Sequence, residues 1–357
     1  MKTSNTAEFK NFYVICEQRD NHVQKVSYEL IGEATKLAAA YKEATGRDEK
    51  VIAVVLGDNV QPVCQSLLDH GADEAIYIED PMLKEYVTEP YVKACVQLIE
   101  EKKPNVVLFG ASSVGRDLAP RTASRVHTGL TADCTKLTME MDDKYPGKSV
   151  NDVLLHMTRP AFGGNIMATI LIRHHRPQMA TVRPGVMELI EVVPNKPGVI
   201  EEYKVEFAPE DMNVKIVEVL KEGKKAVDIT EAKYLVSGGR GIGSADFYNE
   251  LQKVATLLGG EISSSRANVD AGWIEKSRQV GQTGKTVRPD LYMACGISGA
   301  IQHLAGMDQS EYILAINKND EAPIFEVADL GIVGNVRVII PKLVEALAKY
   351  KEDEANV

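Results

Sequence analysis

The stretch from Val51 to Glu79 reads VIAVVLGDNVQPVCQSLLDHGADEAIYIE, and it predicts the fold of the first half of the chain. VIAVVLG and EAIYIE are short runs rich in β-branched residues, which is typical of buried strands. Between them, residues 62–70 have the composition of a helix that ends before Gly71. A strand, a helix and a second strand in this order predict parallel strands joined by a helical crossover.

The same alternation continues on both sides of this stretch. FYVICE at residues 12–17 predicts a strand, and a helix-period apolar pattern over residues 30–41 follows it. A helix over residues 86–102 precedes NVVLFG at residues 105–110, which predicts a further strand. Strands and helices in strict alternation predict an α/β fold with a mainly parallel sheet and helices on both faces.

The pattern changes after about Pro146. DVLLHMTRP and NIMATILIRHH predict two strands joined by a turn at Gly163 and Gly164, and we expect them to extend the same sheet. QMATVRPG predicts one more strand. Residues 196–229 lack the alternation, so we expect a connecting segment there. The predicted domains are residues 1–205, a linker at 206–230, and residues 231–357.

A second α/β unit is predicted from about Ala232. KYLVSGGRGIG is a strand followed by a Gly-rich turn, and the next helix has Phe247, Leu251 and Val254 on one face. A final helix is expected from Pro341 to about Tyr350, because proline suits the first turn of a helix. Each domain is therefore predicted to hold a mainly parallel sheet flanked by helices.

Composition and charge exclude several function classes. The 357-residue chain carries a formal net charge of -10, which argues against nucleic acid as a partner. Its five cysteines have no C-x-x-C spacing, so we expect reduced, buried thiols and no iron–sulfur cluster. The polar start MKTSNTAEFK is no signal peptide, and no apolar run is long enough to span a membrane. We expect a cytoplasmic protein.

VSGGRGIGS, residues 236–244, could form a phosphate site. A strand that ends in glycines before a helix directs backbone N–H groups at an anion, and Arg240 could add a bidentate contact. The stretch matches neither G-x-G-x-x-G nor a P-loop. A tight structural turn therefore explains it about as well as a ligand site.

Two later stretches hold further candidate ligand residues. SSSRANVDAGW places Arg266 among hydroxyls, where it is either a surface residue or a donor to a planar anion. QVGQTGKTVRPDLYMACGISGAIQHLAGM, residues 279–307, contains glycines, Thr283, a possible helix cap at Ser298, and His303. The histidine alone is more often structural. Together these residues predict a dinucleotide or flavin-nucleotide site, but not a reaction, and no hydrolase or metal motif is present.

The order of these motifs resembles the alpha subunit of electron-transfer flavoproteins. SGGRG, SRANVDAGW, QVGQTGK, GISGAIQHLAGM, AINKNDEAPIF and ADLGIVG carry the resemblance between Tyr234 and Val338. EQRD, ELIGEATKLA, TGLTADCTKL and RPAFGGNIMATI extend it more loosely over the first domain. The resemblance implies a Rossmann-like FAD-binding domain at the C-terminus and a beta-subunit interface on the N-terminal domain.

The resemblance also implies which residues contact FAD. Arg266 would lie over the flavin ring, Thr283 would bond near N5, and His303 would approach the pyrimidine carbonyl; these three would tune the flavin. The full implied set is Arg240, Ser265, Arg266, Val280, Gly281, Gln282, Thr283, Ser298, Gly299, Ala300, Ile301, Gln302, His303, Asn317 and Asp329.

The first-domain motifs are more similar to the electron-bifurcating branch of the family. That branch implies an electron-carrier subunit in an NADH-dependent complex, with a second FAD in the beta subunit. Single electrons would pass to an acyl-CoA dehydrogenase or similar flavoenzyme, and to ferredoxin or flavodoxin. The alternatives are a non-bifurcating shuttle with AMP in the beta subunit, a nucleotide-binding module without redox function, and an NAD-dependent dehydrogenase, which the missing G-x-G-x-x-G disfavours.

Overall fold

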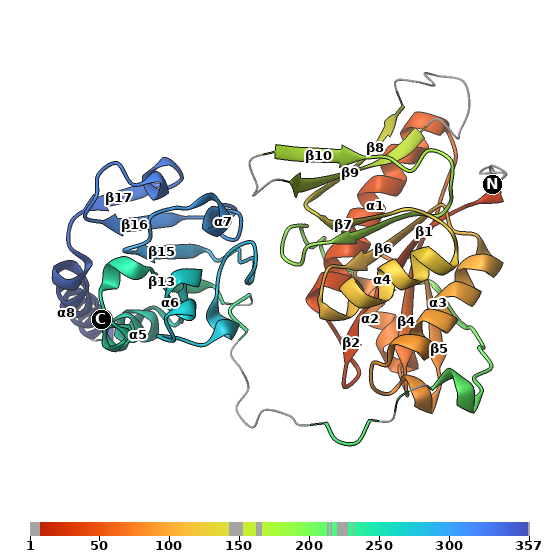
Figure 1. The fold of residues 1–357 in the computed structure, drawn as a ribbon, viewed down its shortest axis with the longest axis horizontal. Helices are drawn as coiled ribbons and strands as arrows, with labels where there is room; N and C mark the ends of the chain where they lie inside the picture. Colours follow the sequence, from red (N-terminus) through yellow and green to blue (C-terminus); the bar gives the residue numbers. More distant parts are fainter. Residues whose placement is uncertain are drawn as a thin grey trace. The chain divides into compact units, whose positions relative to one another are not determined.

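A computed structural model of the chain describes residues 8–142, 153–161, 166–212, 214, 216–219, 228–230 and 232–355. The described residues up to Val219 form one compact unit, unit 1, and those from Asp228 onward form a second, unit 2 (Figure 1). Each unit contains a parallel sheet flanked by helices, so the predicted fold class is confirmed. The domain boundaries predicted near residues 205 and 230 stay predictions.

Unit 1 is built around a seven-stranded parallel sheet. Its strands are β1 (Phe12–Cys16), β4 (Val51–Gly57), β5 (Glu74–Glu79), β6 (Val106–Gly110), β7 (Leu130–Cys134), β11 (Gln178–Val182) and β12 (Val199–Glu202). They lie in the order β12–β5–β4–β1–β6–β11–β7. A short hairpin, β2 (Gln18–Arg19) and β3 (His22–Val23), follows β1.

Four helices cover the two faces of this sheet. They are α1 (Lys25–Thr45), α2 (Cys64–Asp69), α3 (Thr88–Lys102) and α4 (Ser113–Arg125). Side chains alternate between the faces of a strand. Phe12 and Val14 of β1 accordingly join α1 and α2 in one core, whereas Tyr13 and Ile15 join α3 and α4 in the other. Burial on both faces explains why the strands contain uninterrupted apolar runs.

One sequence prediction for unit 1 is wrong. DVLLHMTRP and NIMATILIRHH do not extend the main sheet; they form β9 (Val153–Ala161) and β10 (Ile166–Ile170) of a separate antiparallel sheet with β8 (Lys136–Met141). The turn predicted at Gly163 and Gly164 lies outside the described residues. β7 already occupies the edge beside β11, and the small sheet packs on α1 through apolar side chains of β8 and β9.

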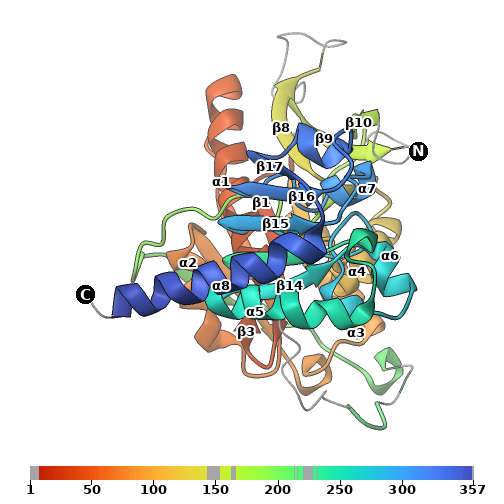
Figure 2. The same cartoon turned by 90° about the vertical axis from the view of Figure 1, so that its left-hand side faces the viewer.

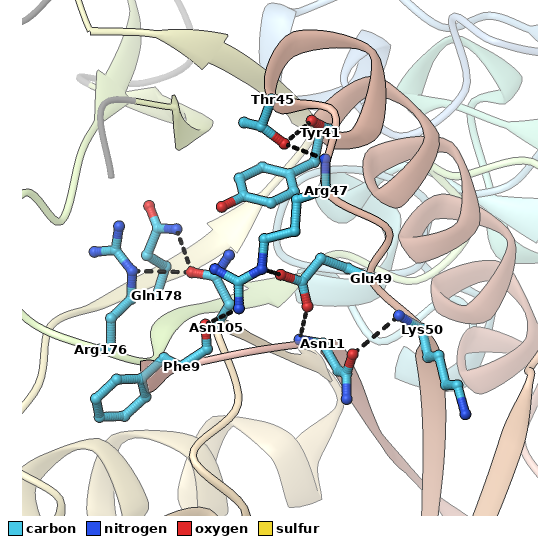
Figure 3. Close-up of polar contacts among 10 residues, drawn as sticks. All are labelled: Phe9, Asn11, Tyr41, Thr45, Arg47, Glu49, Lys50, Asn105, Arg176 and Gln178. Carbon is cyan, nitrogen blue, oxygen red and sulfur yellow. Dashed lines mark hydrogen bonds and ion pairs between the residues drawn. The ribbon is translucent and has the colours of Figure 1, made fainter. Parts of the chain in front are cut away.

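A buried polar cluster joins the amino ends of neighbouring strands in unit 1 (Figure 3). The carboxylate of Glu49, 1% exposed, lies 2.7 Å from Nε of Arg47 and accepts a hydrogen bond from the backbone N–H of Asn11. Nearby, Nε of Arg176 donates to Oδ1 of Asn105 at 2.9 Å. Burial lowers the pKa of Arg176 to about 10. The contacts of Glu49 tie the segments that lead into β1 and β4, and the contact of Arg176 ties the segments that lead into β6 and β11.

Replacing Glu49 by glutamine is expected to lower the free energy of unfolding by about 1–3 kcal/mol, because Arg47 loses its buried counter-ion. The amide oxygen can still accept from Asn11, but the amide nitrogen then faces Nε of Arg47, so the cost includes the lost charge and a lost acceptor. A urea titration followed by far-UV circular dichroism measures it. Asp48→Asn is the control, because Asp48 is 80% exposed in a surface pair with Lys42. An equal loss in both variants would contradict the assigned role of Glu49.

Unit 2 is built around a five-stranded parallel sheet in the order β14–β13–β15–β16–β17. Its strands are β13 (Tyr234–Gly238), β14 (Glu261–Ser264), β15 (Leu291–Cys295), β16 (Ile313–Asn317) and β17 (Leu330–Val333). Its helices are α5 (Tyr248–Leu258), α6 (Arg266–Asp270), α7 (Ile301–Leu304) and α8 (Val336–Ala355). Figure 2 shows α5 and α8 side by side, and both pack on one face of the sheet. Loops and the short helix α7 cover the other face.

The predicted start of the last helix is also wrong. The helix begins at Val336 and contains Pro341 in its interior. The side chain of Asn335 accepts a hydrogen bond from the backbone N–H of Arg337 at 3.0 Å. This asparagine cap sets the start of the helix, although proline is more common in the first turn.

Candidate functional site

The carboxyl ends of β13 and β15 frame the candidate site. The chain runs from β13 to β14 on one side and then crosses to β15 on the other side of β13. The connections that leave β13 and β15 therefore lead to opposite faces of the sheet, and open α/β sheets bind ligands at such a point. A cavity of about 700 Å³ lies there. It is lined by Gly239, Arg240, Gly241, Ser265, Arg266, Ala267, Asp270, Gln279, Val280, Gly281, Gln282, Thr283, Gly296, Ile297, Ser298, Ala300, Gln302, His303 and Asn317.

Glycines hold the two loops in direct backbone contact. A Cβ atom added at Gly239 would lie 2.3 Å from the carbonyl oxygen of Gly296. The backbone N–H of Gly241 donates to that same oxygen at 3.0 Å. Gly296 itself has a φ of 64°, which favours glycine. Close packing of the two loops therefore requires glycines in this turn, whether or not the turn also contacts a ligand.

A second loop, residues 279–285, forms another wall of the cavity. The backbone N–H of Gln282 donates to the carbonyl oxygen of Gln302 in α7 at 2.7 Å. Gly281 has a φ of 136°, and a Cβ atom added there would lie 2.8 Å from that carbonyl oxygen. Nε2 of Gln279 donates to Oγ1 of Thr283 at 3.0 Å. This hydrogen bond holds the hydroxyl of Thr283, an exposed residue, in position.

His303 lies in the cavity wall with little access to solvent. Its Nε2 is 2.9 Å from the hydroxyl of Tyr292, which is fully buried in β15. Nδ1 has no hydrogen-bond partner among the described residues. Burial lowers the pKa of His303 to about 4, and the backbone at Val280 acts in the opposite direction. Burial also raises the pKa of Tyr292. The hydroxyl therefore stays protonated and can donate to a neutral imidazole.

Arg266 and Asp270 form an ion pair at the rim of the cavity. Nε of Arg266 is 3.3 Å from Oδ2 of Asp270, and the two side chains are 67% and 64% exposed. Arg240 of the first loop is also exposed. The two arginines supply positive charge at the cavity, which suits an anionic ligand.

The structure brings most of the predicted site residues together. The predicted residues that line the cavity are Arg240, Ser265, Arg266, Val280, Gly281, Gln282, Thr283, Ser298, Ala300, Gln302, His303 and Asn317. Gly299 and Ile301 are sequence neighbours of these lining residues but do not line the cavity themselves. Asp329 lies at the opposite, amino-terminal edge of the sheet, where its carboxylate accepts from the backbone N–H of Ile313 at 2.7 Å. The position of Asp329 therefore gives no support to the predicted contact between Asp329 and the cofactor.

Asp270 and Gln279 also line the cavity but are absent from the predicted site. Asp270 stands four residues after Arg266, and this helical spacing could have identified it as a partner of the arginine. The contact of Gln279 with Thr283 depends on the loop conformation.

The residues present suit a dinucleotide that carries a flavin ring. Arg240 and Arg266 provide positive charge for an anionic ligand, and the hydroxyls of Ser265, Thr283 and Ser298 provide polar contacts. The volume of the cavity is within the range of about 300–1,000 Å³ common for cofactor sites.

The five cysteines are free and buried, as predicted. Among the described residues, no three His, Cys, Asp or Glu side chains are arranged to hold a metal ion.

Comparison with known proteins identifies the family of the chain. Residues 13–208 match the family model of the electron transfer flavoprotein domain, and residues 228–308 match that of the electron transfer flavoprotein FAD-binding domain. The chain is 48% identical over 344 residues to an electron transfer flavoprotein subunit alpha from Clostridium acetobutylicum, covering 95% of this chain and 97% of the relative. The chain belongs to the electron-transfer flavoprotein alpha-subunit family.

Other relatives of this alpha subunit have more specific names. It is 42% identical to the acryloyl-CoA reductase electron transfer subunit beta of Anaerotignum propionicum, over 96% of this chain and 97% of the relative. It is 38% identical to the lactate dehydrogenase (NAD(+),ferredoxin) subunit LctC of Acetobacterium woodii, over 94% of this chain and 76% of the relative. In the part of the alpha subunit that the structure describes, no helix is both long and apolar enough to cross a bilayer.

Proposed function

We propose that this alpha subunit binds one FAD in the cavity of unit 2 and passes single electrons to a partner flavoprotein dehydrogenase. The observation that carries the proposal is the meeting of Arg266, Thr283 and His303, from three separate segments, in one cavity. FAD would supply the redox chemistry when bound. The match of residues 228–308 to the FAD-binding family model supports this placement. A location in the cytoplasm is part of the proposal.

The three residues would have different roles. Arg266 places a positive charge beside the ring and so stabilises negative charge that develops on reduction. Thr283, held by Gln279, offers a hydroxyl near N5. His303, kept neutral by burial, places an imidazole N–H near the pyrimidine carbonyl. The remaining lining residues would bind and orient the cofactor.

The proposed partners are a beta subunit, which completes a heterodimer through unit 1, and an acyl-CoA dehydrogenase or similar flavoenzyme. The name of the Anaerotignum relative supports an acyl-CoA partner. The Acetobacterium relative is named for NAD(+) and ferredoxin, which supports NADH-driven bifurcation with a second FAD in the beta subunit and ferredoxin or flavodoxin as acceptor. The alternative is a non-bifurcating shuttle with AMP in the beta subunit.

The purified heterodimer tests this function. Its flavin and AMP contents are determined first, and the protein is then reduced stepwise without oxygen while absorbance is recorded. Two FAD per heterodimer that are reduced at well-separated potentials would support bifurcation. One FAD and one AMP would support the shuttle. A heterodimer without FAD, or with FAD that cannot be reduced, would contradict the proposed function.

Replacing Arg266 by alanine is expected to lower the reduction potential of the flavin by about 59 mV for one electron, or about 1.4 kcal/mol. An unscreened positive charge at this position would shift the potential further, but solvent screens the Arg266 side chain, which is 67% exposed. A redox titration with indicator dyes measures the shift. Arg288→Ala is the control, because Arg288 contacts Gln309 outside the cavity. Equal potentials for wild type and Arg266→Ala would disprove the tuning role.

A further inference from the structure

The short helix α6 is fixed to the body of unit 2 by its buried face. Asn268, at the centre of α6, is fully buried, and its Nδ2 donates to the carbonyl oxygen of Gly238 at 3.1 Å and to the hydroxyl of Tyr248 at 2.9 Å. That hydroxyl also pairs with Oγ of Ser264 at 2.6 Å. These bonds hold α6 against the ends of β13 and β14, so the orientation of its other face is set.

The other face of α6 carries Arg266 and Asp270. Residues four apart share a face of a helix, whereas Asn268 between them points the opposite way. Both side chains line the cavity, and they form an ion pair at 3.3 Å. Because α6 is anchored through Asn268, this pair is presented at the cavity in one orientation.

Helix stability does not explain this pair. Arg266 is the first residue of α6 and Asp270 is the last. A cation at the N-terminus and an anion at the C-terminus both oppose the helix dipole, and an acidic residue following a basic one is the weaker order for an i,i+4 pair. Both side chains are about two-thirds exposed, so the pair adds little to folding. Its position at the cavity suggests a different role.

The contact leaves most of the guanidinium available. Asp270 accepts a hydrogen bond from Nε of Arg266, and no described residue accepts one from either terminal nitrogen. A guanidinium is a planar fork whose terminal N–H groups recognise planar or anionic ligands. Asp270 therefore holds the arginine from one side and leaves its terminal nitrogens for the ligand.

We propose that Asp270 is a positioning residue that holds Arg266 at the cavity and offsets part of its positive charge, so that it limits the reduction potential of the bound flavin. The proposal rests on the proposed function, because it assigns the flavin as the group that Arg266 faces. The flavin gains negative charge on reduction, so a carboxylate beside the arginine opposes the effect of the arginine. The two residues then set the potential as a pair with opposite signs.

Asp270→Asn in the purified heterodimer tests the proposal. Asparagine keeps an oxygen that can accept from Nε but removes the charge. The reduction potential is expected to rise, which is the opposite sign to Arg266→Ala. In an Arg266→Ala background the same substitution is expected to raise the potential by a similar amount, because the carboxylate acts on the flavin directly through its charge. Asp270→Ala also removes the acceptor for Nε, so with Arg266 present it should raise the potential by less than Asp270→Asn does. Asp270→Glu should restore a potential close to that of the wild type.

Asp246→Asn is the matched control, because Asp246 is exposed in the same unit and does not line the cavity. It should leave the potential unchanged, and neither Asp→Asn variant should change the unfolding midpoint. An unchanged or lowered potential in Asp270→Asn would overturn the proposal, and equal shifts in Asp270→Asn and Asp270→Ala would overturn the positioning role. Those results require FAD in the wild type. A wild-type heterodimer without FAD would instead overturn the proposed function.

Discussion

Replacing Gly281 by alanine is expected to destabilise unit 2 by about 3 kcal/mol and to reduce its flavin content sharply. Gly281 has a φ of 136°, and a side chain at such an angle is strained by about 1–3 kcal/mol. The new Cβ would also lie 2.8 Å from the carbonyl oxygen of Gln302. That oxygen accepts the hydrogen bond from Gln282 that joins the 279–285 loop to α7. The substitution therefore separates two walls of the cavity.

Urea unfolding followed by tryptophan fluorescence measures the loss in unit 2, because Trp273 is the single tryptophan of the chain. The ratio of flavin to protein gives the effect on binding. Gly272→Ala is the matched control: its φ is 70°, but no atom lies within 4 Å of its added Cβ. We expect a loss of about 1 kcal/mol there from the backbone angle alone. Equal losses in the two variants would show that the contact with Gln302 has no energetic role.

The two parallel sheets could be predicted because their central strands are buried on both faces. Burial produces the apolar runs of β1, β4 and β6, and the intervening helices determine that the strands are parallel. The partners of β9 and β10 could not be predicted in this way. Alternation and composition identify a strand, but its pairing depends on contacts with distant residues such as those of α1 and β8.

Most of the predicted site residues line one cavity because they belong to short motifs at strand ends. The other features of the site depend on packing between distant segments, which a sequence motif does not reveal. Gly239 and Gly296 must be glycines because the backbones of their two loops are in contact. The spacing of glycines in the sequence cannot distinguish such a contact from a contact with a ligand. Asp329 occurs in a motif of the family, yet its carboxylate bonds to the backbone of the adjacent strand. Asp270 has no such motif signal, because an exposed i,i+4 pair is common on helices.

The burial of His303 is expected to make the stability of unit 2 depend on pH. The pKa is about 4 in the folded protein, against 6.5 for an ordinary histidine. Between these values the unfolded chain binds the proton and the folded chain does not. The stabilisation is therefore complete above about pH 6.5 and is lost as the pH falls toward 4. The loss is about 2 kcal/mol between pH 7 and pH 5, and about 3 kcal/mol when the pH reaches 4.

The difference in unfolding free energy between wild type and His303→Gln isolates this contribution from other titrating groups. Glutamine keeps a polar side chain beside Tyr292 but does not titrate, so its variant lacks the loss assigned to His303. Urea titrations at pH 7, 6 and 5, followed through Trp273, should show the wild type losing about 2 kcal/mol more than the variant. His175→Gln is the control, because His175 lies in unit 1. Parallel pH profiles for wild type and His303→Gln would mean that the pKa of His303 is not lowered in the folded protein, and burial would then not keep the imidazole neutral below about pH 6.5.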